Sequence, residues 1–203
     1  MQGLSKWKKE IQEFWELETS DRDKLIGEIA AYASTSDPIH LAREVRANYA
    51  QEVDSGISVL YEALTHQPIK WTPFFVQEFE RAFRAAETAS DPKKILSALD
   101  EIAMADENYT ALSDALILVI ANYASSRIFE IRYKVVWFLG DYLRSEITNR
   151  QSDGIAVLRV MLHDENWKIR VLAAQTLKGI DQLPKKFSLS ILDRLRHRFL
   201  QIG

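Results

Sequence analysis

Residues 164–180 read DENWKIRVLAAQTLKGI, and this stretch decides the fold. Apolar side chains recur in it three and four positions apart, as at Ile169 and Ala173. That spacing is typical of an amphipathic helix and predicts one over about 166–180. Asp164 stands just before this helix, where an acidic side chain can cap the first turn.

A second stretch with the same pattern, SRIFEIRYKVVWFLG at 126–140, lies 38 residues earlier in the chain. The shift pairs Arg132 with Arg170 and Leu139 with Leu177. An internal period near 40 with two helices per period indicates a helical solenoid, in which stacked helix pairs bury a continuous core. The sequence therefore predicts an all-α fold, an αα-superhelix of about eleven helices.

The composition fits a folded helical domain that spans residues 1–203, because 47% of the residues are hydrophobic and 27% are charged. The 7 glycines and 5 prolines are few, which suits helices joined by short loops. The absence of cysteine excludes disulfides and cysteine-ligated zinc, and a reducing cytoplasm is the expected location. The strongest apolar run, ALILVIANYA at 115–124, is too short to span a membrane, and we expect a buried helix and no membrane contact.

Helical periodicity and capping residues divide the chain into eleven expected helices. Three of them open with a capping residue followed by proline, at Asp37-Pro38, Thr72-Pro73 and Asp91-Pro92. An irregular link is expected at 66–70. The helices are expected at about 4–17, from 20, from 38, 55–65, from 73, from 92, 109–124, 129–145, 152–162, 166–180 and 188–201.

Charge is unevenly distributed along the chain. Residues 1–126 hold 12 Lys and Arg against 21 Asp and Glu, whereas residues 127–203 hold 14 against 8. Such an asymmetry can mark a surface for an acidic partner. The alternative is that these charges simply solvate the outer faces of the helices.

The two repeated stretches share an Ile-Arg pair early in the helix, then small or branched apolar residues, then a leucine. The positions are Ile131-Arg132, Val135-Val136 and Leu139 in the first copy, and Ile169-Arg170, Ala173-Ala174 and Leu177 in the second. With Asp164 in front, the second copy resembles the second helix of a HEAT repeat; Ser126 replaces this aspartate in the first copy. The resemblance covers about residues 113–180.

This resemblance implies a HEAT-like solenoid in which the arginine pairs with a loop aspartate, here Arg170 with Asp164. It does not imply one function, because family members bind proteins, nucleic acids and small molecules. We expect a non-enzymatic scaffold that binds a protein partner on its concave face, with its oligomeric state left open.

A candidate binding site lies on the helix expected at 129–145. The 38-residue shift places Trp137 on Gln175, which points away from the core stripe of its helix, and Tyr133 and Asp141 share the face of Trp137. An aromatic pair beside a carboxylate is a reasonable binding site, although Trp137 could instead pack in the core. The expected binding residues are Tyr133, Trp137, Asp141, Arg144 and Lys168.

The same helix also resembles the lesion-facing helix of the DNA alkylation repeat glycosylases, through Trp137, Leu139 and Tyr142. That resemblance implies an aromatic wall for an alkylated base, with Asp141 as the stabilising carboxylate. The cations expected on phosphates are Lys134, Arg144, Lys168 and Arg170. Two departures count against this alternative: an earlier Trp/Asp pair is missing, and the N-terminal half is acidic where a DNA cradle should be basic.

Other chemistry has little support in the sequence. The four histidines, His40, His66, His163 and His197, are far apart, and none has a second histidine four positions away. Neither a phosphate-binding glycine loop nor a Gly-x-Ser-x-Gly motif occurs. We therefore expect no catalytic residue, no metal site and no cofactor.

Overall fold

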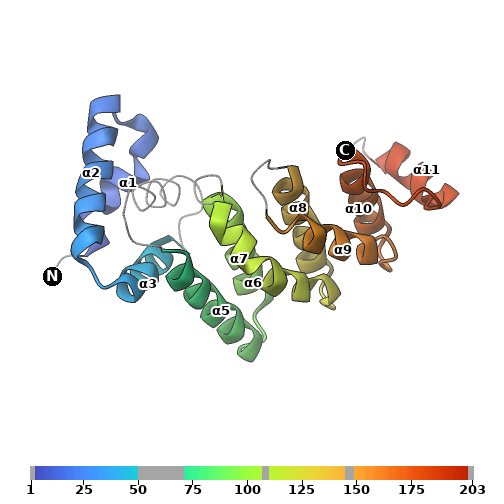
Figure 1. The fold of residues 1–203 in the computed structure, drawn as a ribbon, viewed down its shortest axis with the longest axis horizontal. Coiled ribbons are helices and arrows are strands. Elements are labelled where there is room, and N and C mark those ends of the chain that lie inside the picture. Colours follow the sequence, from blue (N-terminus) through green and yellow to red (C-terminus); the bar gives the residue numbers. More distant parts are fainter. Residues whose placement is uncertain (1–2, 50–70, 107–109, 145–148, 201–203) are drawn as a thin grey trace. The chain divides into compact units, whose positions relative to one another are not determined.

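The computed structural model describes residues 3–49, 71–106, 110–144 and 149–200 (Figure 1). Every regular element in these ranges is a helix, which confirms the all-α prediction for the described chain. None of the described helices combines the length and apolar character that crossing a bilayer requires. The chain divides into two compact units, Met1–Ala115 and Leu116–Gly203, called unit 1 and unit 2 below.

The described residues of unit 1 form three short helical pieces, four longer helices and the beginning of α7. The helix expected at 55–65 and the link expected at 66–70 lie outside the described residues. The elements are η1 (Leu4–Trp7), α1 (Lys8–Gln12), η2 (Phe14–Glu16), α2 (Thr19–Thr35), α3 (Pro38–Tyr49), α5 (Thr72–Thr88), α6 (Pro92–Asp106) and α7 (Thr110–Asn122).

The continuous helix expected over 4–17 is wrong, because the chain forms η1, α1 and η2 there instead. The backbone leaves the helical conformation at Trp7 (φ −106°, ψ 13°) and again at Glu13 (φ −93°, ψ 15°). The indole of Trp7 donates a hydrogen bond to Glu28 (2.9 Å) and its ring packs edge-on against Tyr32. Packing against α2 therefore shapes this segment more strongly than its own helical periodicity.

Two of the three helix caps predicted just before a proline are confirmed. Asp37 accepts a hydrogen bond from the backbone N–H of His40 at the start of α3 (2.8 Å), and Asp91 accepts one from Lys93 at the start of α6 (3.1 Å). The cap expected at Thr72 is wrong, since α5 begins at Thr72 itself. The residue before it, Trp71, has a helical backbone and a fully buried side chain.

The core of unit 1 is centred on α5, which packs against α3 and α6. Its predicted stripe, Phe75, Phe79, Phe83 and Ala86, is buried. Two carboxylates are buried with it, and arginines of α3 neutralise both. Arg43 binds Glu78 (2.8 Å), while Arg46 donates to Glu101 through Nη2 and Nε (2.9 and 3.1 Å).

Unit 2 contains the end of α7, then η3 (Tyr123–Ser125), α8 (Phe129–Arg144), α9 (Gln151–Met161), α10 (Trp167–Gly179) and α11 (Ile191–Leu200). The helix α8 packs against α9 and α10, and α10 packs against α9 and α11. The helices α8 and α10 approach closely where Gly140 faces the side chain of Thr176. Leu177 is fully buried and Gln175 is exposed, so the helical register predicted for α10 is confirmed.

The apolar run 115–124 forms the end of α7 and the start of η3. Leu116, Ile117 and Ile120 are buried, whereas Ala115, Leu118 and Asn122 are exposed. The buried helix expected here is therefore buried along one side and exposed along the other.

Candidate functional site

One face of α8 is buried and the opposite face carries two large exposed aromatics. Ile131, Val135 and Leu139 lie on the buried face, at the spacing that the sequence predicts. Trp137 is 43% exposed and Tyr133 is 40% exposed. Because they are four residues apart, these two side chains lie one above the other on the same face.

Neighbouring side chains hold both aromatics in place. The ring of Phe129 packs against Tyr133 with ring centres 5.6 Å apart. The ammonium group of Lys134 lies 4.3 Å from the centre of the Trp137 ring, a cation–π arrangement. The result is a partly exposed aromatic surface with a positive charge over the ring of Trp137.

A groove of about 290 Å³ adjoins this surface, and side chains of α8, α10 and α11 line it. Tyr133 contributes the α8 side, and His197 contributes the α11 side. A contact of 2.9 Å joins the amide nitrogen of Gln175 to Nε2 of His197 and links α10 to α11. The remaining lining residues are Trp167, Lys168, Val171 and Leu172.

Asn166 positions the α10 part of the groove. Its side chain accepts a hydrogen bond from the backbone N–H of Lys168 (2.9 Å), so Asn166 caps α10. Asp164, the cap expected from the sequence, does not bond to α10 itself. Its side chain accepts a hydrogen bond from the backbone N–H of the capping residue Asn166 (2.7 Å). These contacts fix the first turn of α10, which carries Lys168 and Trp167.

The structure brings together two of the five predicted binding residues in the groove, Tyr133 and Lys168. Trp137 follows on the same face of α8, outside the groove lining. Asp141 and Arg144 lie farther along α8 and form an exposed ion pair with each other (3.2 Å). A pair of this kind contributes little to stability, and it leaves Asp141 already neutralised.

Sequence reasoning did not identify the other five lining residues of the groove, which are Trp167, Val171, Leu172, Gln175 and His197. The 38-residue shift contained part of this signal, because it aligns exposed Gln175 with Trp137. The position of His197 had no such signal, since α11 has no counterpart among the aligned repeats.

The ion pair expected between Arg170 and the carboxylate of Asp164 is wrong. Arg170 donates to the backbone carbonyl of Asp164 (2.6 Å), and its other donors form a two-pronged bond with Asp193 of α11 (2.7 and 3.0 Å). The carboxylate of Asp164 is bound instead by Arg132 of α8 (2.8 and 3.2 Å). Each arginine thus binds an aspartate that lies later in the chain, 32 residues on for Arg132 and 23 residues on for Arg170.

The protonation equilibria reflect these bonds. The hydrogen bond from Arg170 holds the pKa of Asp193 below its ordinary value, against the opposing effect of burial. The hydrogen bond to Asp164 raises the pKa of Arg132. Asp193 is therefore a carboxylate and Arg132 a cation at neutral pH, as structural ion pairs require.

Among the residues that the structure describes, no group of three His, Asp or Glu side chains is arranged to hold a metal ion. Comparisons with protein-family models, curated proteins and solved structures give no match to this chain.

Proposed function

We propose that this chain is a non-enzymatic, HEAT-like helical-repeat scaffold that binds a protein partner on the face formed by α8 and α10. One observation carries this proposal: Trp137 and Tyr133 are ordered, large and partly exposed beside a groove. Tryptophan and tyrosine are enriched among the residues that dominate binding energy at protein interfaces. Lys168 and Lys134 supply a polar rim.

The repeat character of the scaffold is supported by two identical sets of contacts in unit 2. Arg132 donates to the carbonyl of Ser126 (2.7 Å), and Arg170 donates to the carbonyl of Asp164 (2.6 Å), each six residues back. The four residues are related by the 38-residue shift. Repeated positions with repeated bonds are expected when neighbouring structural repeats stack in the same way.

The same shift supports a functional role for Trp137. Its equivalent in the next repeat is Gln175, so stacking of the repeats does not require an aromatic side chain there. The groove volume, about 290 Å³, is at the lower end of the range for ligand pockets. It suits one or two side chains of a bound peptide segment.

Nucleic-acid binding is the alternative, and the exposed Lys168 is what favours it. Two of the residues that this alternative needs are already engaged: Asp141 by Arg144, and Arg170 by Asp193. Phosphate contacts would make the affinity fall steeply with salt concentration. Binding of single- and double-stranded DNA at two salt concentrations separates this alternative from the protein-binding proposal.

The proposal predicts that Trp137→Ala weakens partner binding without unfolding the protein. Peptides selected on the wild-type chain from a displayed library should bind Trp137→Ala more weakly by about 2 kcal/mol or more. The free energy of unfolding should fall by less than about 1 kcal/mol, because the indole is largely at the surface. Affinity is measured by fluorescence anisotropy and stability by urea unfolding.

Trp15 provides a matched control, because it is an exposed tryptophan of unit 1, on η2. Trp15→Ala should leave the affinity for the selected peptides unchanged. Equal affinities for wild type and Trp137→Ala, or a large loss of stability in Trp137→Ala, would contradict the proposal.

A further inference from the structure

The helix α11 presents an apolar surface to solvent. Ile191 is 69% exposed, Leu192 is 64% exposed and Leu195 is 44% exposed. Their spacing of one, three and four residues places them together on one side of the helix. None of them lines the groove described above.

The opposite side of α11 is polar, and it attaches the helix to α10. Asp193 is buried and bound by Arg170, and its backbone N–H donates to the hydroxyl of Ser190 (3.0 Å). His197 contacts Gln175. An ordinary surface helix turns its apolar side to the core; α11 has the reverse orientation, and polar bonds hold it there.

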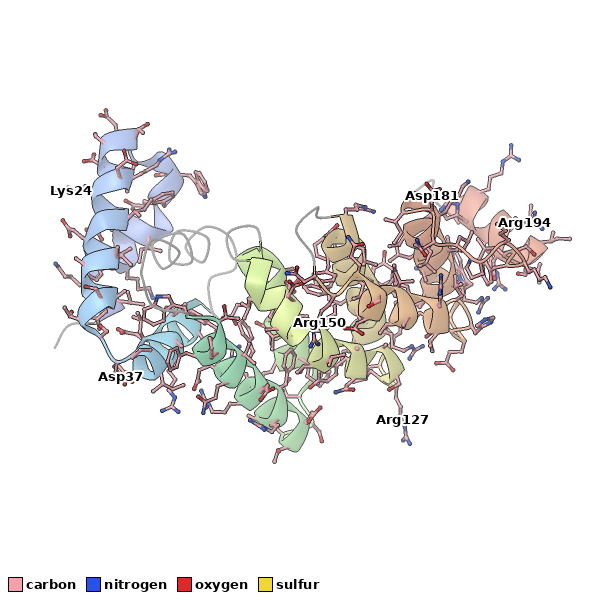
Figure 2. All side chains as sticks on the ribbon, in the orientation of Figure 1. Lys24, Asp37, Arg127, Arg150, Asp181 and Arg194 are labelled. Atoms are coloured by element: carbon pink, nitrogen blue, oxygen red, sulfur yellow. The ribbon has the colours of Figure 1, made fainter. Side chains whose placement is uncertain are left out.

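Positive charge surrounds the exposed apolar surface. Arg194, Arg196 and Arg198 are all exposed on α11, and Figure 2 labels Arg194 on this helix. The sequence of α11 contains one acid, Asp193, which Arg170 already neutralises. No described carboxylate forms an ion pair with Arg194 or Arg198. The surface is therefore both apolar and cationic.

We propose that this face of α11, formed by Ile191, Leu192 and Leu195 with their flanking arginines, binds an acidic amphipathic helix of a partner protein. Leucine-type side chains at this spacing form the ridges that fit between the side chains of a second helix. Acidic residues beside the apolar stripe of that helix would meet Arg194 and Arg198. Two α11 helices facing each other would instead bring like charges together, which disfavours self-pairing.

The helix α10 makes the same kind of ion pair as α11, but a further helix packs against it. Arg132 of α8 binds Asp164 ahead of α10, and Arg170 of α10 binds Asp193 of α11 in the same two-pronged way. The helix α11 is thus bonded to α10 in the same way as the start of α10 is bonded to α8. In turn α10 is packed against α11, whereas the outer side of α11 has no such neighbour among the described residues.

The test uses the full chain and a synthetic helical peptide of about 18 residues, long enough to form a helix on binding. The peptide carries leucines at positions i, i+3, i+4 and i+7 with glutamates beside them. A scrambled peptide of the same composition and a peptide with lysines in place of the glutamates are the controls. Fluorescence anisotropy should show binding of the first peptide, with both controls at least tenfold weaker.

Two variants locate the binding surface. Leu192→Ser combined with Leu195→Ser, and separately Arg194→Glu combined with Arg198→Glu, should each weaken binding at least tenfold. Trp137→Ala should have no effect, so the outcome is independent of the groove proposed above. The charge variant serves as the second test if the serine variant loses helical signal in circular dichroism.

Three results would overturn this inference. The first is equal affinity of the scrambled peptide, which would mean charge attraction alone. The second is binding to vesicles of anionic lipid without binding to the peptide, which would indicate a membrane surface. The third is concentration-dependent dimerisation in analytical ultracentrifugation that Leu192→Ser with Leu195→Ser abolishes, which would show that a second copy covers this face.

Discussion

The ion pair between Arg170 and Asp193 ties α11 to α10. The side chain of Asp193 is 4% exposed and that of Arg170 is 23% exposed, so water screens the bond only weakly. Removing one partner of a buried pair leaves the other charge unsatisfied, at a cost of about 3–5 kcal/mol when both are fully buried. The partial exposure of Arg170 lowers that cost.

Asp193→Asn should therefore lower the free energy of unfolding by about 1.5–3 kcal/mol at pH 7, the range for hydrogen bonds to charged groups. The pKa of Asp193 lies below its ordinary value of 3.8 in the folded state. Its stabilisation is thus complete above that value and is lost as the pH falls through the folded-state pKa. Urea unfolding at pH 7 and pH 3 should show the difference between wild type and variant shrinking at the lower pH.

Asp153 of α9 is the control, since its contact with Arg150 is exposed and 3.9 Å long. Asp153→Asn should change the free energy of unfolding by less than about 0.5 kcal/mol at either pH. A difference between Asp193→Asn and wild type that stays constant from pH 7 to pH 3 would refute an ionic role for Asp193.

Some features at the residue scale were predictable from the sequence. The repetition of arginine at 132 and 170 predicts a structural role for this position. The carboxylate partner predicted for Arg170 is wrong, because Asp193 lies 23 residues beyond Arg170 and only the packing of α11 brings it near. The partial exposure of Trp137 could not be decided from its helix alone, since it depends on which neighbouring helices cover it.

At the scale of elements, the contact between α8 and α10 depends on a small residue. A Cβ atom added to Gly140 would lie 3.3 Å from Oγ1 of Thr176. Glycine within a helix lowers the stability of that helix by about 1 kcal/mol relative to alanine. The close packing that Gly140 permits between α8 and α10 compensates for this loss. Gly27 of α2 offers a contrast, because nothing lies within 4 Å of its added Cβ.

Gly140→Leu should therefore lower the free energy of unfolding by about 1–3 kcal/mol, as overpacked positions do. Gly27→Leu should be neutral or stabilising, because leucine is a better helix former and meets no obstacle. Thermal and urea unfolding of both variants measure the difference. If the two variants are equally stable, α8 and α10 do not approach as closely as described.

Helix boundaries followed from the sequence where local signals agreed with packing. Asp37 and Asp91 precede prolines and cap α3 and α6 as predicted. Thr72 also precedes a proline, but the buried Trp71 adopts a helical backbone, and α5 begins one residue before that proline. The pieces at 4–16 show the same effect, since the packing of Trp7 and its neighbours interrupts a helix that the periodicity favours.

At the scale of the whole molecule, the all-α fold class follows from the helical periodicity of the apolar residues and from the scarcity of glycine and proline. The groove could not be predicted in full, because it needs α8, α10 and α11 together, and α11 shows no alignable repeat. The positive charge of residues 127–203 has a partial structural explanation: Arg132 and Arg170 neutralise buried aspartates, whereas Arg194, Arg196 and Arg198 remain at the surface of α11.

We propose that the aromatic face of α8 and the adjoining groove bind a partner segment. The most direct test records the indole N–H signals of the five tryptophans by NMR while a library-selected peptide is added to the ¹⁵N-labelled chain. The signals of Trp137 and Trp167 should shift, while those of Trp7, Trp15 and Trp71 stay in place. A peptide that binds without moving the Trp137 and Trp167 signals would contradict the account.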